Sequence, residues 1–308
     1  MKRWSGRTAL SASLACASIA LVLTVAPHPV RISAAAATVT AAPTTVGKSP
    51  SPTPATSARP TPSETDPQPQ PDLGTRVADA IRREVPGAEV GVEVYDLDSD
   101  IVLTSLDADQ QFASMSVVKL LIAIDALASG NWAAPTGDAS DQLTQMLSDS
   151  DDDIASSLWD SDGGTAIISR MAQLMGLTGT APPADPGEWG DTMITAQDMV
   201  TVYRYLSVSI PGPARDFLYN AMYHASERAA DGTDQYFGIP GGLPGTTWAI
   251  KQGWGSSGDE AYFNTTGLIG KNSRFVVVVL SSAALDSYGQ MAHALTSGTA
   301  QLAGLVSA

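Results

Sequence analysis

The segments with strand-forming character fall into two groups that lie far apart in the chain. Residues 91–96 (GVEVYD) and 101–106 (IVLTSL) alternate or run apolar on either side of a polar turn, which is typical of a β-hairpin. Residues 248–251, 261–269 and 274–281 form the second group, and its run FVVVVL is typical of a buried central strand. Residues 115–230, between the groups, have mainly helical spacing. The two ends of the chain must therefore meet to complete one sheet.

Helical spacing at both ends of this region completes the arrangement. Apolar positions recur at helical spacing over residues 75–85 and stop at a Pro-Gly pair, and residues 283–305 return to that spacing after the last strand. We therefore predict an α+β fold, in which terminal helices flank an antiparallel sheet and the middle of the chain forms a helical subdomain. We assign residues 74–308 to this domain.

The chain before residue 74 changes composition twice. Residues 1–37 combine three basic residues near the start, an uncharged apolar run and an Ala35-x-Ala37 site, which is the pattern of a secretory signal peptide or of an uncleaved signal anchor. Residues 38–73 hold nine of the 20 prolines, mixed with Thr, Ser and Ala, and this composition favours an extended linker. We expect the domain to be secreted or held in the cell envelope.

Cysteine usage and net charge narrow the classes of partner. Cys16 is the only cysteine, so no intramolecular disulfide can form. Lipid modification of Cys16 is an alternative, but Cys16 lies within the apolar run and Ser13 stands where a lipoprotein signal usually has Leu. With 17 basic and 32 acidic residues the chain has a net charge of −15 and no basic cluster, which argues against a nucleic-acid partner. We expect a monomer without cofactor or metal that contacts a membrane only through an uncleaved N-terminal segment.

The strongest chemical signal is the segment FASMSVVK at the head of an apolar helical run. Ser116 and Lys119 are spaced i and i+3, so on a helix they share one face and can come within hydrogen-bond distance. A serine at a helix start has its backbone N–H free to hold an oxyanion, and a desolvated lysine can act as a base. Two more motifs follow in the chain: Ser150-Asp-Asp in a loop between helical stretches, and Lys251-Gln-Gly in a strand after a turn-rich segment.

With these three motifs, residues 74–308 resemble the penicillin-recognising serine hydrolases, and specifically the class A β-lactamases. That family uses Ser-x-x-Lys, Ser-Asp-Asn and Lys-Thr-Gly motifs in this order. The resemblance implies that Ser116 is the acyl-accepting nucleophile and Lys119 its activating base. It implies that Ser150 relays a proton to the leaving group, and that Lys251 sets the local field and attracts a substrate carboxylate. The substrate would be a β-lactam or a cell-wall-type amide or ester.

The resemblance also assigns residues that would touch the substrate. The backbone N–H groups of Ser116 and Trp254 would form the oxyanion hole, and Gly253 would let the strand approach the ligand closely. Asp152 and Gln252 occupy substrate-binding positions, but they depart from the family: Asp152 replaces an Asn that can donate a hydrogen bond, and Gln252 replaces a Thr or Ser hydroxyl.

The class A β-lactamases use a glutamate to activate the water that hydrolyses the acyl-enzyme, and the sequence shows no clear counterpart of this residue. Counting back from the ITAQDM segment places it near residues 177–180, where the sequence has no acid. Glu188, in the loop 182–191, is the nearest candidate. We therefore expect an acyl-enzyme that decays slowly.

Three other patterns have simpler interpretations. Asp149, Asp151 and Asp153 resemble the start of a Ca²⁺ loop, but the glycine of such a loop is missing, and an acidic helix start explains them better. His224 and His293 lack a Gly-x-Ser-x-Gly partner and are expected on helix surfaces.

The tryptophans after residue 130 are expected in the core, except Trp254 between two glycines, which fits a cleft rim.

Two function classes remain open at this stage. One is a serine hydrolase that acts by acyl transfer, and the other is a non-catalytic envelope domain that kept the fold and a ligand cleft. The four retained residues Ser116, Lys119, Ser150 and Lys251 favour the first. The departures at Asp152 and Gln252 and the missing deacylation base favour the second.

Overall fold

A computed structural model of the chain describes residues 68–306. The expected signal segment 1–37, with Cys16, and the expected linker as far as residue 67 lie outside the described residues. The first helix, α1 (Asp72–Glu84), begins three residues before the expected residue 75, and Leu73 already packs in the core.

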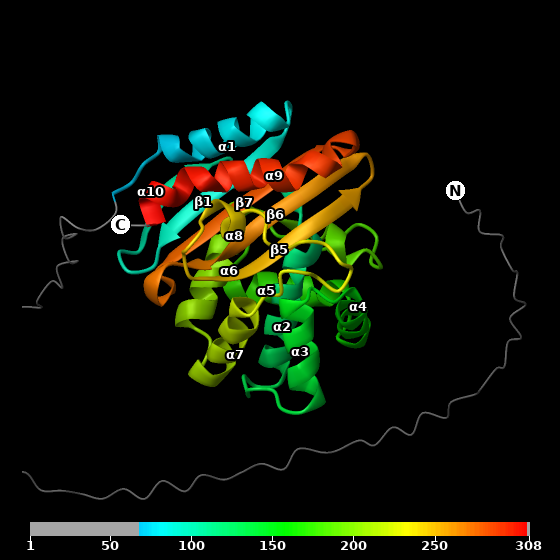
Figure 1. The fold of residues 1–308 in the computed structure, drawn as a ribbon. Coiled ribbons are helices and arrows are strands. Elements are labelled where there is room, and N and C mark those ends of the chain that lie inside the picture. The colour runs from blue at the N-terminus through cyan, green and yellow to red at the C-terminus, as the bar shows by residue number, and fades with distance from the viewer. Residues whose placement is uncertain (1–67, 307–308) are drawn as a thin grey trace, which may run out of the picture. The chain divides into compact units, whose positions relative to one another are not determined.

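Five strands form one antiparallel sheet in the order β2-β1-β7-β6-β5 (Figure 1). Their bounds are β1 (Glu89–Asp96), β2 (Ile101–Leu106), β5 (Trp248–Ser257), β6 (Glu260–Ile269) and β7 (Phe275–Ala284). The hairpin β1–β2 pairs with β7 from the other end of the chain, as the grouping of strand segments predicts. The FVVVVL run lies in β7 at the centre of the sheet, and these side chains are buried. The predicted α+β fold with an antiparallel sheet is confirmed.

Strand β5 is longer than its sequence signal. The expected strand covers residues 248–251, whereas β5 continues to Ser257 and pairs with β6 over its whole length. Gly253 and Gly255 weaken the strand pattern because glycine has low strand propensity. Pairing with β6 overrides that preference, and it carries β5 past the residues of the third motif.

Helices cover both faces of the sheet (Figure 1). On one face lie α1 and α9 (Tyr288–Thr299), which pack on each other, with the short helices α8 (Ile239–Gly242) and α10 (Ala303–Val306) beside them. The helical subdomain on the other face consists of α2 (Val118–Ser129), α3 (Asp138–Ser148), α4 (Asp152–Ser161), α5 (Thr165–Met175), α6 (Ala196–Val208) and α7 (Gly212–Tyr223). A two-stranded ribbon of β3 (Phe112–Ala113) and β4 (Met193–Ile194) lies beside it. None of the helices within residues 68–306 is both long and apolar enough to cross a bilayer.

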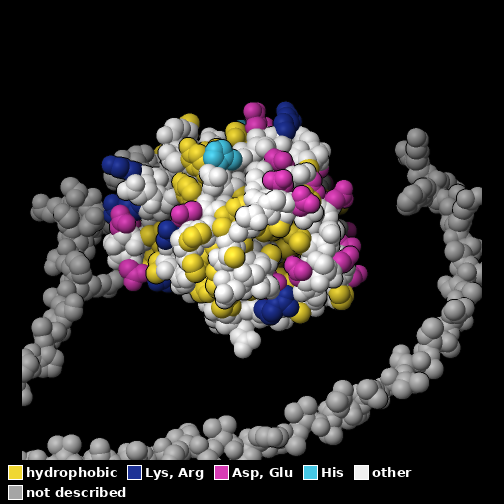
Figure 2. Space-filling view, turned by 90° about the horizontal axis from the view of Figure 1, so that it is seen from below, with side chains coloured by type: hydrophobic (Ala, Val, Ile, Leu, Met, Phe, Trp, Pro, Cys, Tyr) yellow, Lys and Arg dark blue, Asp and Glu magenta, His cyan; other side chains and the backbone are white. Residues whose placement is uncertain are grey.

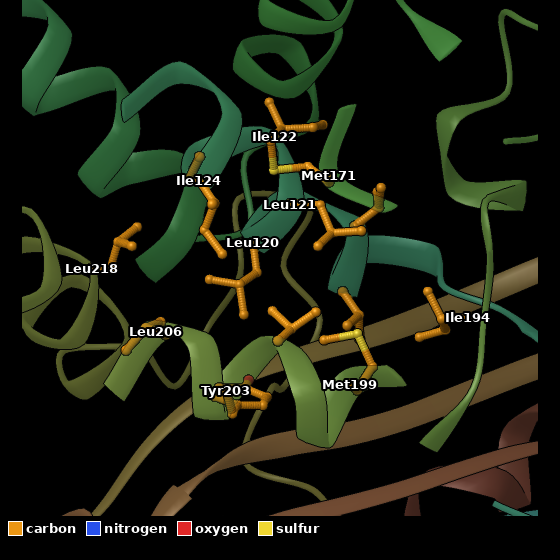
Figure 3. Close-up of a cluster of buried hydrophobic side chains, with 14 of the residues drawn as sticks. Leu120, Leu121, Ile122, Ile124, Met171, Ile194, Met199, Tyr203, Leu206 and Leu218 are labelled. Carbon is orange, nitrogen blue, oxygen red and sulfur yellow. The ribbon is translucent and has the colours of Figure 1, made fainter. Parts of the chain in front are cut away.

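Helix α2 is the centre of the subdomain core. Figure 3 labels Leu120, Leu121, Ile122 and Ile124 of α2 with Met171, Ile194, Met199, Tyr203, Leu206 and Leu218 from surrounding elements. A helix that is apolar all round belongs in an interior, and nine of the twelve residues of α2 are buried. Lys119 stands in the first turn of this helix, so the fold desolvates its ammonium group.

Candidate active site

The segment that leads into α2 places Ser116 in a strained and well-supported turn. Ser116 lies in the 3₁₀ turn η1 (Met115–Val117), and the preceding Met115 has φ = 48°, a left-handed conformation that is uncommon for a residue with a side chain. The side-chain amide of Asn264 donates to the carbonyls of Ala113 at 2.9 Å and Ser114 at 3.2 Å. The Ser114 N–H donates to the carbonyl of Thr192, the residue before β4. These bonds fix the backbone that carries the Ser116 hydroxyl.

The predicted contact between Ser116 and Lys119 is present. Lys119 Nζ lies 2.8 Å from Ser116 Oγ, and it also donates to the carbonyl of Ser150 at 2.7 Å and to Ser150 Oγ at 3.2 Å. The Lys119 side chain is 0% exposed. Burial lowers the pKa of Lys119 from its ordinary value, and the hydrogen bond and charge of Asp152 oppose this shift. Burial thus favours the neutral amine that a base would need, whereas the ion pair with Asp152 favours the ammonium.

Ser150 and Lys251 join the same cluster from two other elements. Ser150 follows α3 with φ = 56°, and Lys251 in β5 donates to Ser150 Oγ at 2.9 Å and to the carbonyl of Gln252 at 3.3 Å. Complete burial, and then the nearby charge of Lys119, hold the pKa of Lys251 well below its ordinary value. The four residues to which the sequence assigns catalytic roles thus form one connected network, and the roles themselves stay predictions.

The geometry at Asp152 differs from the expectation for a substrate-binding residue. The Asp152 carboxylate accepts from Lys119 Nζ at 2.5 Å, although its own side chain is 63% exposed. A carboxylate beside a buried ammonium forms an ion pair, whereas the Asn of the family motif would form a neutral hydrogen bond. Asp152 also lines the hollow in front of Ser116, as expected for a substrate-binding residue, but its carboxylate is paired with the ammonium of Lys119.

Gln252 and Gly253 make contacts inside the protein and do not line the hollow in front of Ser116. Gln252 is 1% exposed, and its amide donates to the carbonyls of Gln235 at 3.2 Å and Phe237 at 2.7 Å, because two backbone acceptors of the adjoining loop need donors. A Cβ on Gly253 would lie 2.4 Å from the carbonyl oxygen of Ser114. Glycine is thus needed at this position for the close approach between β5 and the turn that bears Ser116, and the approach of β5 to a ligand stays a prediction.

A hollow of about 410 Å³ opens in front of Ser116. Its lining includes Ser116, Asp152, Trp254 and the loop residues Glu188 and Trp189, together with Met115, Ser156, Gly187, Gly190, Asp191, Asp231, Gly255 and Ser256. Trp254 is therefore at the cleft rim as expected, and the oxyanion role of the Ser116 and Trp254 backbone N–H groups stays a prediction.

Trp189 and Asp231 are site residues that the sequence interpretation missed. The ring of Trp189 lies 4.9 Å from Lys119 Nζ, and Asp231 Oδ2 accepts from Trp254 Nε1 at 3.1 Å. Trp189 begins a short 3₁₀ turn (Trp189–Asp191) and Asp231 lies in a turn, and neither segment has a periodic pattern. For Trp189, its place beside Glu188 in the loop 182–191 was the one available signal.

Two carboxylates lie in or near the expected position of a deacylation base, Asp198 and Glu188. The backbone N–H groups of Thr178 and Gly179 and the hydroxyl of Thr180 all donate to the carboxylate of Asp198. Asp198 is 3% exposed and is used to hold this loop, and it does not line the hollow. Glu188 is exposed and lines the hollow, which keeps it as the candidate.

The simpler interpretations of the remaining motifs hold. The Asp151 carboxylate caps α4 by accepting from the N–H of Ile154 at 3.0 Å, which confirms the acidic helix start. His224 and His293 are exposed. The ring of His224 hydrogen-bonds to the Asn220 carbonyl, and the ring of His293 hydrogen-bonds to the Glu84 carboxylate. Across residues 68–305, no group of three or more His, Cys, Asp or Glu side chains is arranged to hold a metal ion.

Solved structures with this architecture include several β-lactamases and PBP-A. A β-lactamase from Burkholderia vietnamiensis matches with a TM-score of 0.63 and 19% identity, over 76% of this chain and 96% of that chain. PBP-A matches with a TM-score of 0.58 and 20% identity over 78% and 98%. A class A β-lactamase from Bacteroides cellulosilyticus DSM 14838 matches with a TM-score of 0.57 and 15% identity over 75% and 99%. At these identities the likeness shows the fold alone, and it confirms the predicted fold.

Sequence relatives come from mycobacteria. The proteins named "Putative lipoprotein LppW" in Mycobacterium bovis and in Mycobacterium tuberculosis are 34% identical over 217 residues, which is 68% of this chain and 68% of theirs. No protein-family model matches the chain. The chain belongs to the family of these mycobacterial LppW proteins, and its domain has the class A β-lactamase-like fold.

Proposed function

We propose that this protein is an extracytoplasmic serine hydrolase in which Ser116 takes an acyl group from a β-lactam or from a cell-wall-type amide or ester. The observation that carries the proposal is the 2.8 Å contact between Ser116 Oγ and a completely buried Lys119, at the floor of an open hollow. A place in the cell envelope is supported by the signal-like start of the chain and by the printed name of the LppW relatives, which calls them lipoproteins.

The proposed acyl transfer uses the network in a fixed order. The neutral Lys119 amine takes the proton of the Ser116 hydroxyl as Oγ bonds to the substrate carbonyl carbon. The backbone N–H groups of Ser116 and Trp254 hold the oxyanion. Ser150, which lies between Lys119 and Lys251, passes a proton to the leaving nitrogen or oxygen as its bond to the carbonyl carbon breaks. The product is an ester on Ser116.

Hydrolysis of that ester is the slow step of the proposal. Water attack needs a positioned base, and Glu188 is the candidate that lines the hollow, at an exposed position. A chromogenic β-lactam or ester should give a burst of about one product per protein molecule followed by little turnover. Ser116→Ala should abolish the burst, and Glu188→Gln should lower only the residual turnover. Steady turnover near ~10 s⁻¹ would contradict slow deacylation.

The ion pair between Lys119 and Asp152 favours a second candidate function. A carboxylate that binds the buried ammonium stabilises the protonated lysine, which cannot act as a base. This ion pair and the inward-facing Gln252 are the features expected of a binding domain that kept the fold but lost catalytic activity. That function predicts saturable binding in the hollow with no burst from the wild-type protein.

A further inference from the structure

Every charged side chain in the lining of the hollow is a carboxylate. They are Asp152, Glu188, Asp191 and Asp231, and no Lys or Arg lies among the described residues of the lining. Figure 2 shows, for the face that it presents, that acidic side chains gather along one side of the molecule. The chain as a whole has a net charge of −15. The charged side chains that a ligand would meet in the hollow are therefore all negative.

The two lysines of the catalytic network offer a ligand no accessible cation. Lys119 is 0% exposed and Lys251 is 1% exposed, so neither ammonium reaches the surface of the hollow. Lys119 is bound by Asp152, and Lys251 donates to Ser150 Oγ and to the Gln252 carbonyl. A ligand carboxylate would find no accessible cation here and would meet repulsion from the lining.

Two indole rings in the lining add a second and independent feature that suits a cation. Trp254 is held by its Nε1 donating to Asp231 at 3.1 Å, and Trp189 by its Nε1 donating to Ser156 at 3.1 Å. The Trp189 ring already accepts one ammonium, that of Lys119, at 4.9 Å from its centroid. Tryptophan faces attract ammonium and guanidinium groups, and most strongly where water is excluded.

Asp231 is the best-placed partner for such a group. Its carboxylate is held by the backbone N–H of Thr233 at 2.8 Å, by the Thr233 hydroxyl at 3.1 Å and by Trp254. Among residues 68–305, no lysine or arginine forms an ion pair with Asp231 or with Glu188, although the charge of Asp231 also acts on the buried Lys119. A preorganised carboxylate beside an aromatic face loses little entropy when a cation binds.

From these features we propose that the hollow selects acyl donors that carry a positive charge, an ammonium or guanidinium group, over neutral and anionic ones. The cation lies between Trp254, Asp231 and Glu188 while the donor carbonyl reaches Ser116. This inference rests on the proposed function for the chemical step, but the charge preference of binding can be measured without that step.

A matched pair of acyl donors isolates the charge. The p-nitrophenyl esters of 4-(trimethylammonio)butanoic acid and of 5,5-dimethylhexanoic acid have the same shape and differ by one positive charge. In both, Ser116 Oγ bonds to the acyl carbon, p-nitrophenolate leaves, and Lys119 takes the hydroxyl proton. We expect at least about tenfold faster acylation by the cationic ester at limiting concentration, and the ratio should fall as salt is added. An equal rate, or a faster rate for the neutral ester, would overturn the proposal.

Binding to the Ser116→Ala protein separates this inference from the proposed function. Calorimetry with the two corresponding amides should show at least about tenfold tighter binding of the trimethylammonio amide. Equal affinities would overturn the charge preference whatever the chemistry does. A clear preference with no burst from either ester in wild type would instead overturn the proposed function and leave the charge preference standing.

Variants locate the cation site. Asp231→Asn and Glu188→Gln should each lower the ratio of cationic to neutral affinity severalfold, and the double variant should lower it further. Asp79→Asn removes an exposed carboxylate from α1, across the sheet from the helical subdomain, and should leave the ratio unchanged. A ratio that is the same in all four variants would place the preference outside this hollow and overturn the assignment.

Discussion

At the scale of single residues, Asp152, which stands where the class A β-lactamase motif has Asn, most alters the chemistry of the site. Its carboxylate opposes the burial that lowers the pKa of Lys119, so Asp152→Asn should lower that pKa further. At pH values below the pKa, each unit of lowering gives about tenfold more free amine. We therefore expect faster acylation of Ser116 at pH 7 and a rate profile that levels off at lower pH.

The neighbouring Asp153 provides the control for this change. It is also exposed and also lies in the first turn of α4. Asp153→Asn removes the same charge from the same turn and should leave the pH profile of acylation in place. An unchanged or slower rate in Asp152→Asn at every pH would show that the ion pair does not restrain the base.

Glu93 is a buried carboxyl whose effect falls on stability. It stands in β1 with 6% exposure, and burial raises its pKa to about 7, with Arg204 opposing. Because the pKa is raised in the folded state, the contribution of Glu93 to the stability of the fold is most favourable below the unfolded pKa of 4.5. It is lost as the pH rises through the folded pKa of about 7. Glu93→Gln should therefore gain stability over wild type between pH 5 and pH 8, on the order of 2–3 kcal/mol in urea unfolding. If the difference in unfolding free energy between Glu93→Gln and wild type were the same at pH 5 and at pH 8, the raised pKa of Glu93 would be contradicted.

Sequence reasoning found the residues whose positions follow from local spacing and motif order. Ser116 and Lys119 share a helix start, and Ser150 and Lys251 could be placed once the order of motifs was clear. The inward turn of Gln252 could not be predicted, because it depends on unpaired carbonyls in a loop that pairing and packing bring alongside.

At the scale of elements, the contact between β5 and η1 is what positions the nucleophile. Gly253→Ala would place a Cβ 2.4 Å from the Ser114 oxygen, a distance that forces the two segments apart. We expect at least about a hundredfold loss of acylation rate, since small displacements of reacting groups are costly, with a loss of about 1–3 kcal/mol in the free energy of unfolding.

Gly289→Ala in α9 is the matched control. A Cβ at Gly289 meets nothing within 4 Å, and alanine has the better helix propensity, so this variant should keep full acylation and gain about 0.5–1 kcal/mol in stability. Equal acylation rates in the two variants would contradict a positioning role for the close approach at Gly253.

The elements of the sheet were predictable because their patterns are strong. The apolar run of β7 specifies a buried strand without help from the rest of the chain, and the alternation of β1 specifies a strand, although packing buries β1 on both faces. The ribbon β3–β4 was not predicted, because two-residue strands carry no periodic signal and form only through their tertiary partner. The extension of β5 was missed because Gly253 and Gly255 weaken the strand pattern there.

At the scale of the whole molecule, the account depends on a nucleophile that only the complete fold assembles. Ser116 comes from the turn before α2, Ser150 from the loop after α3 and Lys251 from a strand that follows the helical subdomain. A catalytic site of this kind should react once per molecule, at one residue, and only in the folded protein.

The most direct test of this claim is mass spectrometry of the protein after incubation with the uncharged and the cationic p-nitrophenyl esters and with benzylpenicillin. We predict a single adduct per molecule, located by peptide mapping at Ser116, absent from Ser116→Ala and absent from urea-unfolded protein; it should form fastest with the cationic ester and slowest with benzylpenicillin, which carries a carboxylate. No adduct from folded wild type with any of the three donors, or an adduct on another residue that persists in Ser116→Ala, would contradict the account.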